Sequence, residues 1–268
     1  MHIAKKRFGQ NFLIDRSVIN NIVDSIQPQA DDYMIEIGPG LGAITKPLLK
    51  RLNHLNVIEL DRDIIPKLIN NCVFDDATNK DKLHINEIDV LKFDFSTFHS
   101  QLIVQKGFNK KLRIIGNLPY NISTPVLFHL LKQRQLIDDM HFMLQKEVVD
   151  RIVAVPGTKS YGRLSVMIQT FFHVQSLFDV PPYSFEPAPK VDSSILRLQP
   201  ITQYEDKIND FSAFEKLVRQ AFSQRRKTLR NTLKGLRTSE QIIQANISPT
   251  QRAEELFVND FVNLFTIN

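Results

Sequence analysis

Residues 34–45, MIEIGPGLGAIT, decide the fold of this chain. Residues 33–37 are mostly apolar and predict a short buried strand, after which Gly38, Gly40 and Gly42 form a loop with few side chains. Apolar residues then recur at helical spacing, at Ile44, Leu48, Leu49 and Leu52. A strand, a glycine loop and a helix form the first turn of a nucleotide-binding α/β fold, because glycine lets the backbone approach a cofactor closely.

The spacing of these glycines bears on the choice of cofactor. A dinucleotide site is usually G-x-G-x-x-G, with a pyrophosphate at the helix N-terminus. Here the third glycine comes one residue earlier, and Glu36 precedes Gly38 by two residues. This variant resembles the loop of S-adenosylmethionine-dependent methyltransferases. That cofactor has no phosphate, so Glu36 is tolerated and could hold its positive amino or sulfonium end. The loop favours S-adenosylmethionine but leaves NAD open.

Two acids follow later predicted strands. Glu59 lies in the second strand, residues 56–61, 21 positions after Gly38, and an acid at about 20 residues accepts hydrogen bonds from ribose hydroxyls. Asp89 ends a third predicted strand, residues 83–89, and could accept a hydrogen bond from an adenine amino group. The structural alternatives are an exposed acid at a strand end and an Asp that starts a loop.

The sequence Asn-Leu-Pro-Tyr, residues 117–120, leaves another short buried strand at the edge where open α/β sheets bind ligands. Asn117 offers an amide oxygen as acceptor, and the proline keeps Leu118 extended with its carbonyl outward. Tyr120 supplies a flat ring for stacking. Two acceptors that grip the hydrogens of an exocyclic base amine free its lone pair for attack on a methyl group, while the ring holds the flipped base. The alternative is an Asx-type turn with a buried Tyr.

Composition limits the other possibilities. The chain has 34 Lys and Arg against 29 Asp and Glu, a formal charge of +5. No apolar run approaches the ~20 residues that span a membrane, and we expect neither a signal peptide nor membrane contact. Cys72 is the single cysteine and the seven histidines have no ligand spacing, so we expect no disulfide, no metal and a cytoplasmic protein.

Positive charge is concentrated in two places. Seven basic residues and no acid occur between positions 219 and 237, namely Arg219, Arg225, Arg226, Lys227, Arg230, Lys234 and Arg237. Lys5, Lys6 and Arg7 form a second cluster, close to Phe8 and Phe12. Such clusters indicate a polyanionic partner, and the alternative is a solvated helix face.

The order of patterns predicts two domains. Residues 1–200 alternate strands and helices, whereas residues 201–268 contain only helical patterns after a polar linker. We therefore expect a Rossmann-like domain with a mostly parallel seven-stranded sheet, followed by a small all-α C-terminal domain. The resemblance of the glycine loop implies that the first is a class I S-adenosylmethionine-dependent methyltransferase domain.

Several motifs together resemble the ribosomal RNA adenine N6-dimethyltransferases, most closely the branch that acts on the small subunit. They are EIGPGLG at 36–42, NLPY at 117–120, KRFGQNFL at 6–13, QKEVVDRIVAVPGTKSYGRLS at 145–165 and FEPAPKVDS at 185–193. The resemblance runs from residue 4 to about residue 235. It implies cofactor contacts at Asn11, Leu13, Gly38, Glu59, Asp89 and Asn117. It also implies that Asn117 and the Leu118 carbonyl grip the target amine and that Tyr120 and Phe185 sandwich the adenine.

The leading interpretation is dimethylation of two adjacent adenines in a hairpin near the 3′ end of 16S ribosomal RNA, in the 30S particle, by a monomeric enzyme that supports small-subunit biogenesis. The C-terminal domain would form one wall of a basic RNA-binding cleft. An alternative is a ribosome-assembly factor in which binding matters more than catalysis. A third interpretation, an NAD-dependent dehydrogenase, leaves residues 117–120 and the basic run unexplained.

Overall fold

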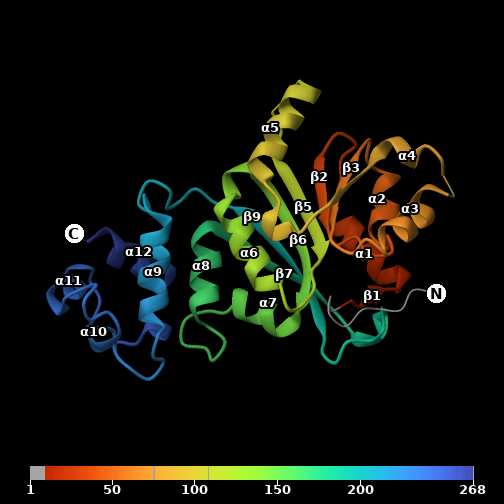
Figure 1. The fold of residues 1–268 in the computed structure, drawn as a ribbon. Coiled ribbons are helices and arrows are strands. Elements are labelled where there is room, and N and C mark those ends of the chain that lie inside the picture. Colours follow the sequence, from red (N-terminus) through yellow and green to blue (C-terminus); the bar gives the residue numbers. More distant parts are fainter. Residues whose placement is uncertain (1–9, 75, 108, 268) are drawn as a thin grey trace. The chain divides into compact units, whose positions relative to one another are not determined.

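Seven strands form one sheet in the order β4-β3-β2-β5-β6-β9-β7 (Figure 1). The computed structural model describes residues 10–74, 76–107 and 109–267. Neighbouring strands from β4 to β6 are parallel, and β9 is antiparallel to β6. The predicted α/β class with a mostly parallel sheet is therefore confirmed. The strands are β2 (Tyr33–Ile37), β3 (Leu55–Glu59), β4 (Leu83–Glu87), β5 (Leu112–Asn117), β6 (Ile137–Gln145), β7 (Phe172–Val180) and β9 (Ser193–Pro200).

The strand order places a topological switch at the centre of the sheet. From β2 the chain adds β3 and β4 on one side and β5 and β6 on the other. Because β2 and β5 are parallel and Ile37 pairs with Gly116, the loops that follow both strands leave from one edge. Ligands of open α/β sheets bind in the crevice at such a point.

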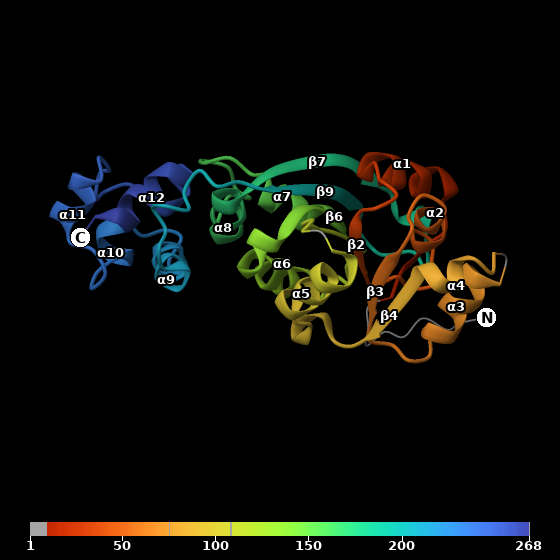
Figure 2. The same ribbon diagram turned by 90° about the horizontal axis from the view of Figure 1, so that it is seen from above.

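Helices cover both faces of this sheet (Figure 2). One face carries α1 (Arg16–Ile26) and α2 (Thr45–Leu49), and the other carries α5 (Phe95–Lys106) and α6 (Ser123–Lys132). The short helices α3 (Ile65–Val73) and α4 (Asn79–Lys82) connect β3 to β4. Helix α1 begins where the Asp15 carboxylate accepts hydrogen bonds from the Ser17 and Val18 N–H groups, and it buries Val18, Ile22, Val23 and Ile26.

A second, two-stranded sheet was not predicted. It pairs β1 (Phe12–Leu13) with β8 (Phe185–Glu186), so that Leu13 faces Phe185. The pairing continues where the Ile14 N–H donates to the Ser184 carbonyl at 2.8 Å. It joins the chain before α1 to the proline-rich segment before β9.

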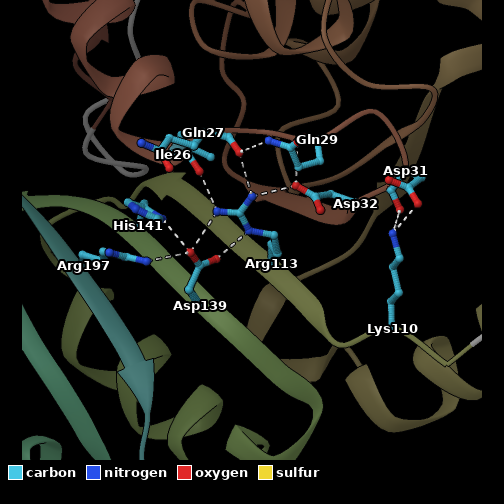
Figure 3. A network of polar contacts seen from close by, with 10 residues as sticks. All are labelled: Ile26, Gln27, Gln29, Asp31, Asp32, Lys110, Arg113, Asp139, His141 and Arg197. Carbon is cyan, nitrogen blue, oxygen red and sulfur yellow. Dashed lines mark hydrogen bonds and ion pairs between the residues drawn. The ribbon is translucent and has the colours of Figure 1, made fainter.

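An ionic network ties the amino ends of β5 and β6 to the end of α1 (Figure 3). Arg113 donates to both oxygens of Asp139 at 2.8 and 2.9 Å, to Asp32 at 2.6 Å and to the Ile26 carbonyl at 2.6 Å. Burial alone would lower the pKa of Arg113, but these two carboxylates raise it. Burial also lowers the pKa of nearby His141 to about 4, so its ring is neutral at physiological pH. This network lies at the edge of the sheet opposite the glycine loop.

The chain divides into two compact units, Met1–Lys146 with Ser176–Leu198, and Glu147–Gln175 with Gln199–Asn268. The second unit contains α8 (Arg163–Phe171), α9 (Phe211–Ala221), α10 (Leu229–Thr232), α11 (Ser239–Gln244) and α12 (Val258–Thr266), and most of α7 (Lys146–Ile152). Its core is aromatic, with Phe214 edge-on to both Phe171 and Phe265 and Phe222 stacked on Phe261. Residues 147–175 belong to this unit, so the predicted boundary at residue 200 stays a prediction.

Within the described ranges, none of the helices combines the length and hydropathy that a membrane span requires. The basic cluster predicted at Lys5, Lys6 and Arg7 lies outside the described residues.

Candidate cofactor and substrate site

A cavity of about 1050 Å³ opens at the switch point between β2 and β5. Its wall comes from residues 10–14 of the N-terminal segment, the glycine loop, the ends of β3 and β5 and the start of α2. Of the predicted site residues, it brings together Asn11, Leu13, Gly38, Glu59, Asn117, Leu118 and Tyr120. The carboxyl edge of the sheet therefore collects these residues from distant parts of the sequence.

The glycine loop forms one wall of the cavity, where Gly38, Gly40 and Gly42 have no β-carbons. Gly38 has φ of 68° and donates from its N–H to the Ile58 carbonyl at 2.9 Å. A Cβ on Gly40 would lie 3.2 Å from the Phe12 ring. A Cβ on Gly116 in β5 would lie 2.5 Å from the Ile37 carbonyl oxygen, so glycine allows β2 and β5 to pack closely.

Glu36 is one of the residues that line this cavity. Its side chain is buried, with the residue 2% exposed, and accepts a hydrogen bond from the Thr45 hydroxyl at 2.7 Å. Burial, opposed by the Thr45 hydrogen bond and helped by the charge of Glu59, raises the pKa of Glu36 to about 7. Burial of a carboxylate is offset by a positive group beside it, so a contact between Glu36 and the positive end of a ligand stays a prediction.

Glu59 lies at the end of β3 with one carboxylate oxygen held by the Asp61 N–H at 2.8 Å. Burial raises the pKa of this carboxyl, while hydrogen bonds from the backbone of Asp61, Leu60 and Gly40 lower it. Leu60, Ile88 and Val90 line the cavity beside it, and Leu60 is 51% exposed. An acid next to an apolar surface suits a nucleoside, whose ribose is polar and whose base is flat.

Asp89 has a different position from the one predicted. Strand β4 ends two residues earlier, at Glu87, and the Asp89 carboxylate caps the short helix Val90–Lys92 by accepting from the Leu91 N–H at 2.9 Å. Ile88 and Val90 line the cavity but Asp89 is not among the lining residues. Its role in holding adenine stays a prediction.

Asn117 and Leu118 occupy the end of β5 at the cavity. The Asn117 side-chain nitrogen donates to the Asn11 carbonyl at 3.1 Å. The Leu118 N–H donates to the Met143 carbonyl at 3.2 Å, and the Ile122 N–H closes the following turn on the Pro119 carbonyl. The Leu118 carbonyl takes no part in that turn, but the whole residue is 0% exposed, so its contact with a target amine stays a prediction.

Two hydrogen bonds hold Tyr120, one at its side-chain hydroxyl and one at its backbone carbonyl. Its hydroxyl is 2.8 Å from the Ser193 hydroxyl of β9, and its carbonyl accepts from the Ser123 hydroxyl at 3.2 Å. Burial raises the pKa of Tyr120. The ring lines the cavity with a fixed orientation, as a stacking surface requires.

Phe185 is not at the cavity. It is 3% exposed and belongs to the hydrophobic core cluster together with Leu13. The ring therefore packs inward here, and its contact with a substrate base stays a prediction that requires the segment after β7 to rearrange.

Sequence reasoning missed two partners of the site. The Gln10 amide donates to the buried Asp61 carboxylate at 2.9 Å, which fastens the N-terminal segment to the end of β3. Ser193 anchors Tyr120. Gln10 and Ser193 belong to the motifs at 6–13 and 185–193. Nothing in the spacing of those motifs indicates that the two residues contact Asp61 and Tyr120.

The residues present fit S-adenosylmethionine. The backbone cradle at the glycines, the buried Glu36 carboxylate and the Glu59 carboxylate beside apolar side chains match a ligand with a cation, a ribose and a base. Within the described ranges, no three His, Cys, Asp or Glu side chains group as metal ligands.

Comparison with known proteins agrees with this geometry. A family model for "Ribosomal RNA adenine dimethylase" matches residues 1–268. A protein named Ribosomal RNA small subunit methyltransferase A from Neisseria meningitidis serogroup A is 52% identical over 263 residues, which cover 98% of this chain and 95% of that protein. Its namesake from Methylobacillus flagellatus is 51% identical over 261 residues, covering 97% and 96%.

Solved structures have the same fold. A dimethyladenosine transferase from Plasmodium falciparum aligns with a TM-score of 0.78 at 25% identity, covering 94% of this chain and 95% of that one. The 23S rRNA methyltransferase ErmE aligns with a TM-score of 0.68 at 22% identity, covering 95% and 98%.

These relatives do not favour the assembly-factor or dehydrogenase alternatives. The chain belongs to the ribosomal RNA adenine dimethylases, enzymes that transfer methyl groups from S-adenosylmethionine to adenine in ribosomal RNA.

Proposed function

We propose that this enzyme dimethylates N6 of two adjacent adenines in a hairpin near the 3′ end of 16S ribosomal RNA, within the 30S particle, as a monomer in the cytoplasm. The names of the relatives support the small-subunit substrate. The orientation of Asn117 carries the chemical part of the proposal, because its nitrogen is engaged by Asn11 and its oxygen is left to accept.

The chain contributes acceptors and a stacking surface. The Asn117 oxygen and the Leu118 carbonyl would grip the two hydrogens of the adenine amine and turn its lone pair toward the methyl donor. Tyr120, held by Ser193, would keep the flipped base flat. S-adenosylmethionine supplies an activated methyl group on a sulfonium. Proximity and orientation then provide much of the rate.

The second methylation makes a further demand on the site. After the first transfer the amine keeps one hydrogen, so Asn117 and Leu118 share a single donor and the methylated nitrogen must turn within the pocket. Single-turnover assays that separate monomethyl from dimethyladenine test this step, and release of a stable monomethyl product would contradict it.

The second unit supports RNA binding through its basic run. Arg219, Arg226, Lys227, Arg230 and Lys234 are exposed, as a phosphate-binding surface requires. Other members of the run are structural: Arg225 pairs with Glu254 at 2.8 Å, and Arg237 donates to the Leu264 carbonyl at 2.8 Å. We therefore assign to RNA the exposed members other than Arg225, which is exposed but pairs with Glu254.

The decisive experiment incubates the enzyme with labelled S-adenosylmethionine and 30S particles that lack the modification, and then maps the label. We expect dimethyladenine at two adjacent positions in the 3′ hairpin. Label at another nucleotide, or label only in naked 23S RNA, would overturn the proposed substrate. Asn117→Ala separates catalysis from assembly, because normal subunit maturation without methylation would indicate a binding role.

A further inference from the structure

The N-terminal segment, residues 10–14, crosses the edge of the sheet at the cavity. The Gln10 side chain contacts the turn after β3, and the Asn11 carbonyl accepts a hydrogen bond from Asn117 at the end of β5. The Phe12 ring lies against the glycine loop that follows β2. The segment therefore passes over the ends of β3, β2 and β5, which are neighbours in the sheet.

Asp61 is a well-fixed partner for the Gln10 amide. It is 3% exposed, and its N–H donates to the Glu59 carboxylate at 2.8 Å. One oxygen of the Asp61 carboxylate accepts from the Asp63 N–H at 3.2 Å, and the other accepts from the Gln10 amide at 2.9 Å. A buried carboxylate that is held at both oxygens has little freedom to move, so Gln10 is fastened to a fixed point of the turn.

The Asn11 carbonyl lies between two anchors of the chain. On one side Gln10 is bound to Asp61, and on the other side Leu13 pairs with β8 and is 5% exposed. Consecutive Cα atoms lie about 3.8 Å apart, so loss of the Gln10 anchor loosens the chain directly before Asn11. The carbonyl that accepts from the Asn117 side-chain nitrogen at 3.1 Å would then shift.

We propose that Gln10 is a positioning residue for methyl transfer and that it acts through Asn117. The contact of Gln10 with Asp61 sets the place of the Asn11 carbonyl, and this carbonyl orients the Asn117 amide. Asp61 thereby serves two parts of the site, since its N–H also holds Glu59. The inference rests on the proposed function, because it requires the Asn117 oxygen to accept from the target amine.

The first test is a double-mutant cycle in single-turnover methylation of 30S particles that lack the modification, at saturating cofactor. Gln10→Ala should lower the rate of methyl transfer by about tenfold, because misplacing a reacting group by ~1 Å costs up to about 10²-fold. In the Asn117→Ala background the same change should cost less than about twofold, since the group that Gln10 positions is absent. Gln29→Ala is the matched control, because the Gln29 amide also donates a hydrogen bond, to the Gln27 carbonyl at 3.3 Å, and Gln29 is not one of the described residues that line the cavity.

Exchanging the donor and the acceptor separates positioning from a loss of structure. Gln10→Glu places a second carboxylate against Asp61 and should lower the rate at least as much as Gln10→Ala. Adding Asp61→Asn should restore most of the rate, because the new amide donates to the new carboxylate while its oxygen still accepts from the Asp63 N–H. Urea unfolding of each variant shows whether the fold is retained.

Equal losses from Gln10→Ala in the wild-type and Asn117→Ala backgrounds would overturn the inference, because Gln10 would then not act through Asn117. A higher KM for S-adenosylmethionine with an unchanged rate at saturation would also overturn it, since Gln10 would then serve the cofactor. So would an exchanged variant that unfolds like wild type in urea but stays slow. Full activity of Asn117→Ala, or failure of the wild type to methylate 30S particles, would instead contradict the proposed function, so the two failures are distinguishable.

Discussion

The Asn117 side-chain nitrogen lies 3.1 Å from the Asn11 carbonyl oxygen, and this contact fixes which end of the amide points into the cavity. A backbone carbonyl only accepts hydrogen bonds, so the NH₂ group must face Asn11 and the oxygen takes the other end. The segment before α1 thus orients the acceptor that we assign to the target amine. A residue 106 positions away in the sequence sets up the proposed chemistry.

Replacing Asn117 with Ala should lower kcat for methyl transfer by about 10²–10³-fold, the usual loss when one transition-state hydrogen bond is removed. Stopped assays with labelled cofactor measure it. Asn86→Ala is the matched control, because the Asn86 amide donates to the Val57 carbonyl at 3.2 Å and does not line the cavity. Equal losses of kcat in the two variants would assign Asn117 a structural role.

Tyr120 and Ser193 should act as a unit. Tyr120→Phe and Ser193→Ala each remove the 2.8 Å hydroxyl contact and keep the ring, so each should lower kcat/KM only severalfold and the double variant little more. Tyr120→Ala removes the stacking surface, which is worth about 1–3 kcal/mol per base, or roughly 5- to 150-fold. Additive losses in the double variant would show that the two hydroxyls are independent.

The core of the site follows from pattern alone. Gly38, Glu59 and Asn117 each follow or end a strand, and parallel strands bring such ends to one edge, so their proximity is a consequence of the α/β order. The Gln10–Asp61 and Tyr120–Ser193 contacts join residues 51 and 73 positions apart. No periodicity encodes such side-chain partners, because they depend on how separate segments pack.

Phe185 illustrates a second limit. Strands of two residues, such as β1 and β8, are too short to show the alternation of apolar and polar residues from which strands are predicted. The sequence therefore could not indicate that Leu13 and Phe185 pair and that the Phe185 ring enters the core.

Glu36 should make the cofactor-free protein less stable at higher pH. Its pKa in the folded state is about 7 against an ordinary 4.5, so the folded protein binds more protons between these values. This extra proton binding adds to the free energy of unfolding. The contribution is fully present below pH 4.5 and is lost as pH rises through about 7. The shift in the pKa of Glu36 corresponds to a change of at most about 3 kcal/mol in the free energy of unfolding.

Urea unfolding of wild type and Glu36→Gln at pH 5 and pH 8 measures the effect. Because Gln does not titrate, its stability relative to wild type should rise with pH. A constant difference between the two proteins would mean that Glu36 is charged throughout this range.

The Arg113–Asp139 pair should matter for stability and not for catalysis. Arg113 donates to both carboxylate oxygens of Asp139, and Asp139→Asn leaves it one neutral amide oxygen. Breaking such a buried ion pair lowers the free energy of unfolding by about 3–5 kcal/mol. Asp31→Asn breaks the exposed ion pair with Lys110 and should cost less than about 1 kcal/mol. Unfolding curves measure both, and kcat at a permissive temperature should be unchanged, since the network lies at the edge opposite the cavity.

Within the basic run, structural and RNA-binding residues should separate experimentally. Arg237 donates to the carbonyls of Leu236, Leu264 and Phe265 at 2.8, 2.8 and 3.1 Å, so Arg237→Gln should lower Tm and leave the salt dependence of RNA binding unchanged. Arg226 and Lys227 are exposed, so changing both to Gln should reduce the salt slope by about two and leave Tm unchanged. An unchanged slope in that double variant would mean that the exposed part of the run is a solvated face, and the positive charge that binds RNA would have to lie elsewhere.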